Sequence, residues 1–231
     1  MTKRQHNCRK LLLTGVLLVA AAVLSGGCPL VGLLGTPTRR EEKIPAQFDL
    51  AQHKENTLLV LVDQPAWLNA RANLRYYLAN YVGEQLVDKL DFPPDKLISY
   101  DRLSEFRSTR GDFLSLSPPA IGQALGADVV LFVAIESYEL SSRDVANYHK
   151  GAMTAQCSLW QVSSAGKLWP QPEESRRVDV GFEVGPAGGA AAVERLTRAM
   201  AYCITRYFYD CPEDQFRISD DRTQTEWVNW K

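Results

Sequence analysis

The sequence has few of the side chains that usually catalyse reactions or bind metals. Its 231 residues include three histidines and five cysteines. His53 and His149 lie far apart, and neither has a second histidine or cysteine at the spacing of a metal site. The sequence also lacks a phosphate-binding glycine loop, a Gly-x-Ser-x-Gly motif and a recognisable Ser/His/Asp set. We therefore expect no metal, no cofactor and no catalytic residues.

Positive charge is scarce as well. Residues 1–27 carry four basic residues and no acidic one, so the chain after them has 22 basic and 27 acidic residues and a net charge of −5. Proteins that bind nucleic acids need an excess of positive charge on one face. The sequence also has no long run of lysine and arginine. Its composition therefore argues against a nucleic-acid partner and against a polybasic membrane-binding patch.

The N-terminus has the three parts of an export signal. Four basic residues lie within the first ten positions, an uncharged apolar run covers residues 11–24, and Ser25-Gly26-Gly27-Cys28 follows. This order resembles a bacterial lipoprotein signal, in which small residues precede a cysteine that is lipidated and becomes the first residue of the mature chain. It predicts a signal peptide over residues 1–27 and a membrane anchor of lipid, palmitate included, on Cys28.

The alternative is an anchor that is not cleaved. Ser25 occupies the position at which the usual motif has leucine, and residues 11–35 carry no charge and are long enough to span a bilayer. Gly26, Gly27 and Pro29 interrupt that stretch, which favours cleavage. In both cases the rest of the chain lies outside the cytoplasm and is held at a membrane. We expect the cell envelope, with the anchor in the outer membrane rather than the inner one and the domain in the periplasm.

Composition divides the rest of the chain into three regions. Residues 28–55 contain prolines and glycines and are typical of a flexible tether. Residues 56–211 alternate apolar runs with amphipathic segments and are predicted to fold. Residues 212–231 are polar and are predicted to be a loose tail, although Trp227 and Trp230 are unusual there.

The first half of the folded region has the pattern of an α/β protein. Residues 57–62 and 129–135 are short apolar runs, typical of strands buried on both faces. A stripe at helical spacing in residues 69–90 includes Tyr77 and Tyr81, which we expect to be packed inward. In chain order the predicted elements are a strand at 57–62, a helix at 69–90, a short strand at 97–100, one helical turn at 103–106, a helix at 118–125 closed by Gly126, a strand at 129–135 and a turn at 141–144.

The second half has the pattern of antiparallel strands. Residues 148–162 alternate apolar and polar side chains, which is typical of a strand covered on one face. A hairpin turn at 163–167, a strand at 178–184 and a closing amphipathic helix at 190–209 follow. The order is β-α-β-α-β-β-β-α. Early strands joined by helices run parallel and later strands pair as hairpins, so we predict an α/β fold with a mixed β-sheet packed with helices.

Three features resemble a known group of periplasmic domains. They are Leu125-Gly126-Ala127-Asp128 before an apolar strand, the hairpin at 159–169, and the closing amphipathic helix. The order is similar to that of domains like the curli-secretion lipoprotein, the penicillin-binding-protein activator lipoproteins and the Tol N-terminal domain, over residues 57–209. Residues 45–216 also resemble uncharacterised bacterial lipoproteins. The resemblance implies a docking or assembly role, but no membrane-inserting hairpin of the secretion-pore type is present, so we do not expect a pore.

Two classes of function fit these observations. The first is an interaction protein that docks onto an envelope protein partner or onto copies of itself and is not an enzyme. The alternative is an envelope enzyme or a small-ligand-binding lipoprotein with an unrecognised site. A bare sheet edge or an exposed apolar patch favours the first, and a deep pocket with convergent titratable groups favours the second. The expected partner surface is the exposed strand face of Thr154, Gln156, Ser158 and Trp160, or the aromatic tail of Trp227 and Trp230.

The remaining cysteines allow a disulfide in an oxidising compartment. We predict a bond between Cys203 and Cys211. In one continuous helix these residues would lie about 12 Å apart, too far for a bond, so the helix must end near Tyr209. The alternative pairing joins Cys157 to Cys203. Otherwise Cys157, on the inward strand face, stays a buried thiol.

Overall fold

The computed structural model describes residues 43–68, 73–143, 148–184 and 189–213. The chain forms two units, residues 1–41 and 42–231, and all the described residues belong to the second. Its main elements are β2 (Leu58–Asp63), α3 (Leu74–Leu90), β3 (Leu97–Ile98), α4 (Tyr100–Thr109), α5 (Pro118–Leu125), β4 (Val129–Arg143), β5 (Tyr148–Gln161), β6 (Gly166–Trp169), β7 (Arg176–Val184) and α6 (Gly189–Thr205).

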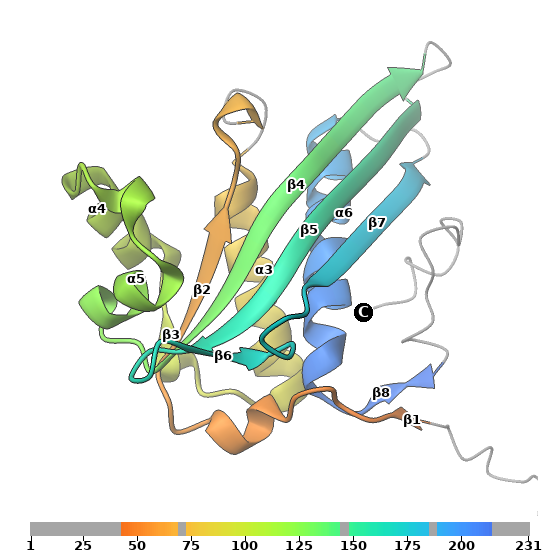
Figure 1. The fold of residues 1–231 in the computed structure, drawn as a ribbon. Helices are drawn as coiled ribbons and strands as arrows, with labels where there is room; N and C mark the ends of the chain where they lie inside the picture. Colours follow the sequence, from red (N-terminus) through yellow and green to blue (C-terminus); the bar gives the residue numbers. More distant parts are fainter. Residues whose placement is uncertain (1–42, 69–72, 144–147, 185–188, 214–231) are drawn as a thin grey trace, which may run out of the picture. The chain divides into compact units, whose positions relative to one another are not determined.

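These strands form one mixed sheet in the order β3-β2-β4-β5-β6, in which β7 also pairs with β5 (Figure 1). β2 runs parallel to both β3 and β4, because helices connect these strands in sequence. β4 and β5 form a long antiparallel pair, and β6 and β7 share the other edge of β5. The predicted α/β class and mixed sheet are confirmed.

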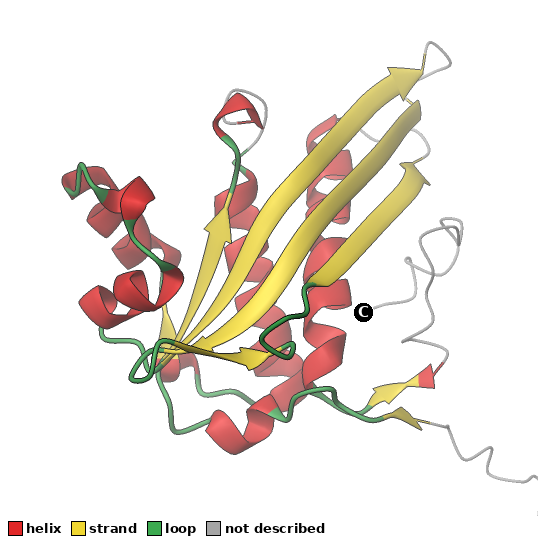
Figure 2. Cartoon of the chain, viewed as in Figure 1, coloured by secondary structure: helices red, strands yellow, loops and turns green. Residues whose placement is uncertain are grey.

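Both faces of the parallel strands are covered by helices (Figure 2). The side chains of β2 alternate between two apolar clusters: Val60 and Val62 lie in one, Leu59 and Leu61 in the other. α3 and α6 contribute to the first cluster, whereas α4 and α5 contribute to the second. This double burial explains why the β2 sequence is an uninterrupted apolar run.

β4 is longer than the apolar run that predicts it. The pairing register with β5 shifts between Ile135 and Ser137, so Glu136 is the extra residue of a β-bulge. Odd-numbered residues face the α3–α6 side up to Ile135, and even-numbered Tyr138 and Leu140 face it after the bulge. Residues 141–143, predicted as part of a turn, therefore continue β4, because their main chain pairs with β5.

α4 is a full helix where the sequence pattern predicts one turn. Its N-cap is Ser99, whose Oγ accepts a hydrogen bond from the main-chain N–H of Arg102 at 3.4 Å. Leu103 is its one buried residue, so the apolar stripe is too thin to be recognised in the sequence.

Residues 43–55, which composition assigns to the tether, form elements of the described structure. β1 (Lys43–Ile44) pairs with β8 (Cys211–Pro212), and the short 3₁₀ helix η1 (Leu50–His53) places Leu50 in the core with no exposed surface. The main-chain N–H of Gln47 donates to the carbonyl of Tyr207 at 2.8 Å. The first and last described segments are therefore tied together. None of the helices in the described part has both the length and the apolarity to cross a bilayer.

Candidate docking groove

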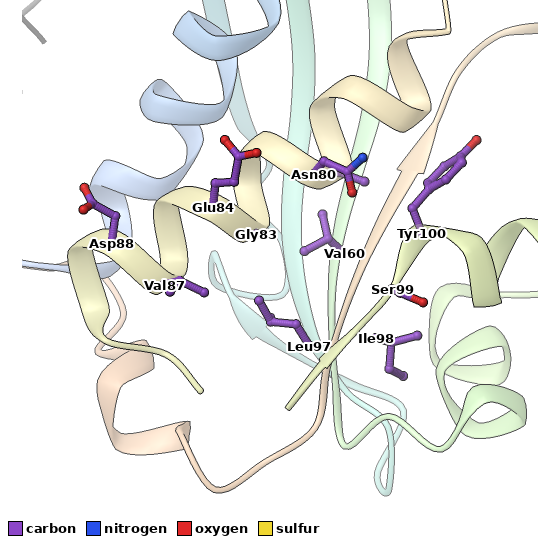
Figure 3. Close-up of a pocket in the computed structure, with 11 residues that line it drawn as sticks. Val60, Asn80, Gly83, Glu84, Val87, Asp88, Leu97, Ile98, Ser99 and Tyr100 are labelled. Atoms are coloured by element: carbon purple, nitrogen blue, oxygen red, sulfur yellow. The ribbon is translucent and has the colours of Figure 1, made fainter. Parts of the chain in front are cut away.

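A groove of about 450 Å³ runs between α3 and the segment formed by β3 and the start of α4 (Figure 3). The groove exists because β3, the edge strand, has only two residues. Within the described sheet, no further strand covers α3 on this side. The residues that line it are Val60, Ala79, Asn80, Gly83, Glu84, Val87, Asp88, Leu97, Ile98, Ser99 and Tyr100.

The walls of the groove are mainly apolar, and its charged rim comes from α3. Figure 3 shows Leu97 directed from β3 toward the part of α3 that carries Gly83 and Val87. Glu84 and Asp88 are exposed and are the charged residues among those that line the groove. The arrangement suits an extended peptide with apolar side chains better than a small polar substrate.

Gly83 keeps the middle of the groove open. A Cβ atom at this position would lie 3.7 Å from Leu97 Cδ1, which is an ordinary van der Waals contact. Alanine would therefore fit, and it would favour the helix by up to about 1 kcal/mol. Packing does not require a glycine inside α3, so its presence there is the sequence signal that could have pointed to the groove.

A cluster of tyrosines continues the groove along α3. We call Tyr76, Tyr77, Tyr81 and Tyr100 the aromatic patch. The ring of Tyr76 lies 5.4 Å from that of Tyr100 and 5.5 Å from that of Tyr77, both edge to face. Tyr76 and Tyr77 are 42% and 38% exposed. The expectation that Tyr77 packs inward is wrong, because Ala79 and Val82 take the buried side of the helix instead.

An ionic network fixes the other side of the patch. The Arg198 guanidinium of α6 lies 4.0 Å above the Tyr81 ring and contacts Glu84 at 3.4 Å and Glu194 at 3.1 Å. Burial raises the pKa of the Tyr81 hydroxyl, and the charge of Arg198 opposes that rise. Because these groups are largely exposed, the network orients Glu84 at the groove rim more than it stabilises the fold.

The groove opens beside a bare stretch of sheet edge. β3 pairs with β2 only at Leu58 and Leu59, so on that side β2 has no neighbouring strand from Val60 onward within the described chain. The carbonyl of Thr57 accepts bonds from Asp128 and Val129 on the β4 side. Carbonyl directions alternate along a strand, so that of Val62 points to the bare edge.

Two arginines cover main-chain carbonyls at this edge. Arg107 Nη2 of α4 donates to the Val62 carbonyl at 3.5 Å, and Arg75 Nη2 of α3 donates to the Gln64 carbonyl at 2.7 Å. Both side chains are half-buried. Burial lowers the pKa of the Arg107 guanidinium, and so does the nearby charge of Arg75, while Tyr100 and Asp63 oppose this.

The strand face predicted as the partner surface is less open than its alternation suggests. Thr154 is buried and donates to Asp179 Oδ1 on β7 at 2.7 Å. Gln156 donates to Glu136 of β4, and the Trp160 Nε1–H donates to Ser158 Oγ at 2.8 Å. Thr154 and Gln156 thus take part in cross-strand bonds, and Trp160 packs against the apolar cluster under α5. Cys28, Trp227 and Trp230 lie outside the described residues.

The predicted Cys203–Cys211 disulfide is not present in the structure. Cys157, Cys203 and Cys211 are all buried thiols. α6 does end before Tyr209, as the prediction required, but the Cys211 Sγ lies 3.4 Å from the Tyr202 hydroxyl instead. Burial raises the pKa of the Cys157 thiol.

The two histidines of the described residues, His53 and His149, have structural surroundings. His53 Nδ1 lies 3.1 Å from Asn56 Nδ2, and its ring stacks on Phe48 at 5.2 Å. His149 lies on β5, where its main chain pairs with Val184. Within the described ranges, no three histidine, cysteine or carboxylate side chains gather as a metal site would require. The expectation of no catalysis stays a prediction.

Comparison with known proteins adds no function. No protein family matches this sequence, and no curated protein does either. Among solved structures, the chain is similar to lipoprotein GNA1162 from Neisseria meningitidis, with 16% identity over 64% of this chain and 96% of that one and a TM-score of 0.41. It is also similar to PelC from Paraburkholderia phytofirmans, described as a dodecamer (6% identity, 73% and 97% coverage, TM-score 0.42), and to the LpoB C-terminal domain from Salmonella enterica (19% identity, 59% and 95% coverage, TM-score 0.30). The structural neighbours thus include bacterial lipoproteins, but at these TM-scores nothing about function is transferred from them.

Proposed function

We propose that the chain is a lipid-tethered envelope protein whose folded domain docks an extended segment of another envelope protein in the groove between α3 and β3, without catalysing a reaction. The observation that carries this proposal is the short edge strand. β3 ends after two residues, and it leaves a groove and a bare stretch of β2 side by side. An added strand is a common way for a sheet edge to bind an extended peptide.

The surroundings of the groove support a protein partner. Exposed tyrosines and tryptophans are enriched at protein interfaces, because they bury a large apolar area and keep a polar group. Tyr76 and Tyr77 lie on the α3 side, and Trp67, on the 3₁₀ helix η2 (Ala66–Leu68), is 62% exposed. A lipid on Cys28 would hold the domain near other envelope proteins and raise their effective concentration.

The groove replaces the strand face as the favoured contact surface. Thr154 and Gln156 already use their polar groups in cross-strand bonds, so that face has less to offer a partner. The groove, in contrast, has apolar walls and an open edge.

Site-specific photo-cross-linking in the native cell tests the proposal. A photoreactive residue at Asn80 in the groove should give a cross-link to one defined envelope protein, identified by mass spectrometry. The same residue at Gln156 on the strand face serves as the comparison position. Gly83→Leu fills the groove and should abolish the cross-link, whereas Gly83→Ala, which adds one methyl in ordinary contact with Leu97 and narrows the groove slightly, should weaken the cross-link without abolishing it.

Two kinds of result would refute the proposal. The first is a cross-linking pattern that excludes the groove: cross-links from Gln156 alone, or cross-links from Asn80 that Gly83→Leu leaves unchanged although that variant folds. If Gly83→Leu fails to fold, Val87→Phe fills the same groove from the next turn of α3. The second is enzymatic turnover that is detected in an unbiased substrate screen and abolished by a single substitution, since this would favour the alternative of an envelope enzyme.

A further inference from the structure

Arg75 and Arg107 lie close to one end of the groove. Tyr100 lines the groove, interacts electrostatically with Arg107, and contacts through its ring Tyr76, the neighbour of Arg75 on α3. The charge of Arg75 in turn acts on Arg107. The two guanidinium groups come from different helices and donate to the carbonyls of Val62 and Gln64, so they are held near each other where β2 and its bare edge end.

The two guanidinium groups have more hydrogen-bond donors than the protein uses. Each group has five N–H donors. Each donates through one Nη to a main-chain carbonyl, and neither Nε atom has an acceptor among the described residues. Arg107 is also fixed in place, because its guanidinium lies 4.6 Å from the centre of the Phe113 ring. The donors are therefore oriented by the protein but are not all satisfied.

Arg107 has a like charge beside it. Arg75 is the neighbouring positive group, and the exposed Asp63 is the carboxylate that opposes its effect on Arg107. Two like charges held together in partly buried surroundings destabilise each other, and an added anion would relieve this. Carboxylate groups are the protein anions whose geometry fits the planar guanidinium fork.

We propose that Arg75 and Arg107 form a carboxylate-binding site at the end of the groove, and that the docked segment places an aspartate, a glutamate or its chain terminus there. This inference rests on the proposed docking function and names the chemistry of the partner. Covering the Val62 and Gln64 carbonyls would need only one donor from each side chain, so the pair has donors beyond that structural task.

A peptide library tests the site directly. The full-length protein in mild detergent is screened against bead-bound ten-residue peptides that have valine, leucine or tyrosine at alternate positions and random residues between them. One half of the library has free C-termini and the other half has amidated ones. Enriched peptides should carry an acidic residue at one fixed position, or should require the free terminus, and the two halves distinguish these sources.

Variants of the pair then measure its contribution. Arg75→Gln and Arg107→Gln should each lower the affinity for the enriched peptides roughly 10- to 100-fold, which is the usual effect of losing a hydrogen bond to a charged group. Arg107→Lys keeps the charge but loses the fork, so its effect should be intermediate. Arg102→Gln, on the exposed side of α4, is the matched control and should leave binding unchanged. Melting curves confirm folding, and if Arg107→Gln does not fold, Arg75→Gln carries the test.

Three outcomes would overturn the carboxylate site. Enriched peptides that show no acidic preference and are lost only in Gly83→Leu would leave docking in place and remove this site. If no peptide is enriched although groove cross-links form in cells, docking is likewise retained and the carboxylate site is removed. Binding to phosphatidylglycerol vesicles that depends on Arg107 and not on peptide would assign the pair to the membrane. If the protein with its native groove gives no cross-link from Asn80, in contrast, the result counts against docking itself.

Discussion

Replacing Gly122 with alanine tests the close contact between α5 and β4. A Cβ atom at this position would lie 2.5 Å from Val130 Cγ2 and 2.8 Å from Val162 Cγ2, well inside the normal separation of about 3.5–4 Å. Val130 is fully buried, and valine has little freedom at χ1, so α5 must move away from β4. Overpacking of this kind costs about 1–3 kcal/mol, and the gain in helix propensity offsets up to about 1 kcal/mol of it.

Gly83→Ala provides the matched control, because the same methyl group is added inside another helix. Its nearest neighbour would be Leu97 Cδ1 at 3.7 Å, so we expect a gain of up to about 1 kcal/mol. Thermal unfolding of the full-length protein, followed by circular dichroism, should show midpoints that move in opposite directions, by about 2–4 °C per kcal/mol. If Gly122→Ala raises the midpoint as Gly83→Ala does, the close approach of α5 to β4 is refuted.

Three further predictions concern the anchor, a buried thiol and a helix end. Mass spectrometry of the purified protein should find a diacylglyceryl group on Cys28 and no peptide from residues 1–27, whereas an intact N-terminus would contradict the lipoprotein signal. Burial raises the pKa of Cys157, with Arg176 opposing, so its contribution to stability is present below the unfolded-state pKa near 8.5 and is lost as the pH rises, by up to about 1.4 kcal/mol per pH unit. Between pH 7 and 10, the free energy of unfolding measured with urea should therefore fall less in Cys157→Ala than in the unchanged protein. An equal pH dependence in the two proteins would refute this. Gly126 closes α5 with φ +74°, so Gly126→Ala should lower stability by about 1–2 kcal/mol, and no loss would contradict the left-handed cap.

The sequence is informative wherever burial is complete. Residues 58–63 and 129–135 are almost entirely apolar because helices cover both faces of those strands, and short apolar runs of this kind are typical of strands buried on both sides. The closing helix is also predictable, since its apolar residues at helical spacing, Leu196, Met200 and Cys203, are all buried.

The sequence is less informative where an element is held by few buried side chains or by main-chain pairing. α4 has one buried residue, so its pattern is that of a loop. The second half of β4 is held by hydrogen bonds to β5 after a bulge, and a bulge changes which side chains face inward without leaving a sequence signature. The polar face of β5 is covered by contacts across strands, as between Thr154 and Asp179, and alternation alone gives no sign of them.

Apart from the glycine inside α3, the sequence has no signal of the groove, because the groove forms where β3 ends early. Its lining comes from β2, α3, β3 and α4, and the polar positions Asn80, Glu84 and Asp88 look in sequence like an ordinary solvated helix face. Tyr76 and Tyr77 look like core residues, because tyrosine is usually at least half buried. Only the fold shows that the neighbouring strand ends early and leaves these side chains beside an open edge.

Edge protection by itself does not account for this part of the molecule. A bare sheet edge favours unwanted association, and Arg75 and Arg107 cover two of its carbonyls, which is a usual protective device. If protection were the whole role, alanine at position 83 would narrow the groove and favour α3 at the same time, since it fits without a clash. The chain instead has glycine there and exposed tyrosines beside it. Residues that lower stability without a packing reason are concentrated at functional surfaces. The combination of a protected edge with an open groove therefore favours a partner that occupies the groove over a role in folding alone.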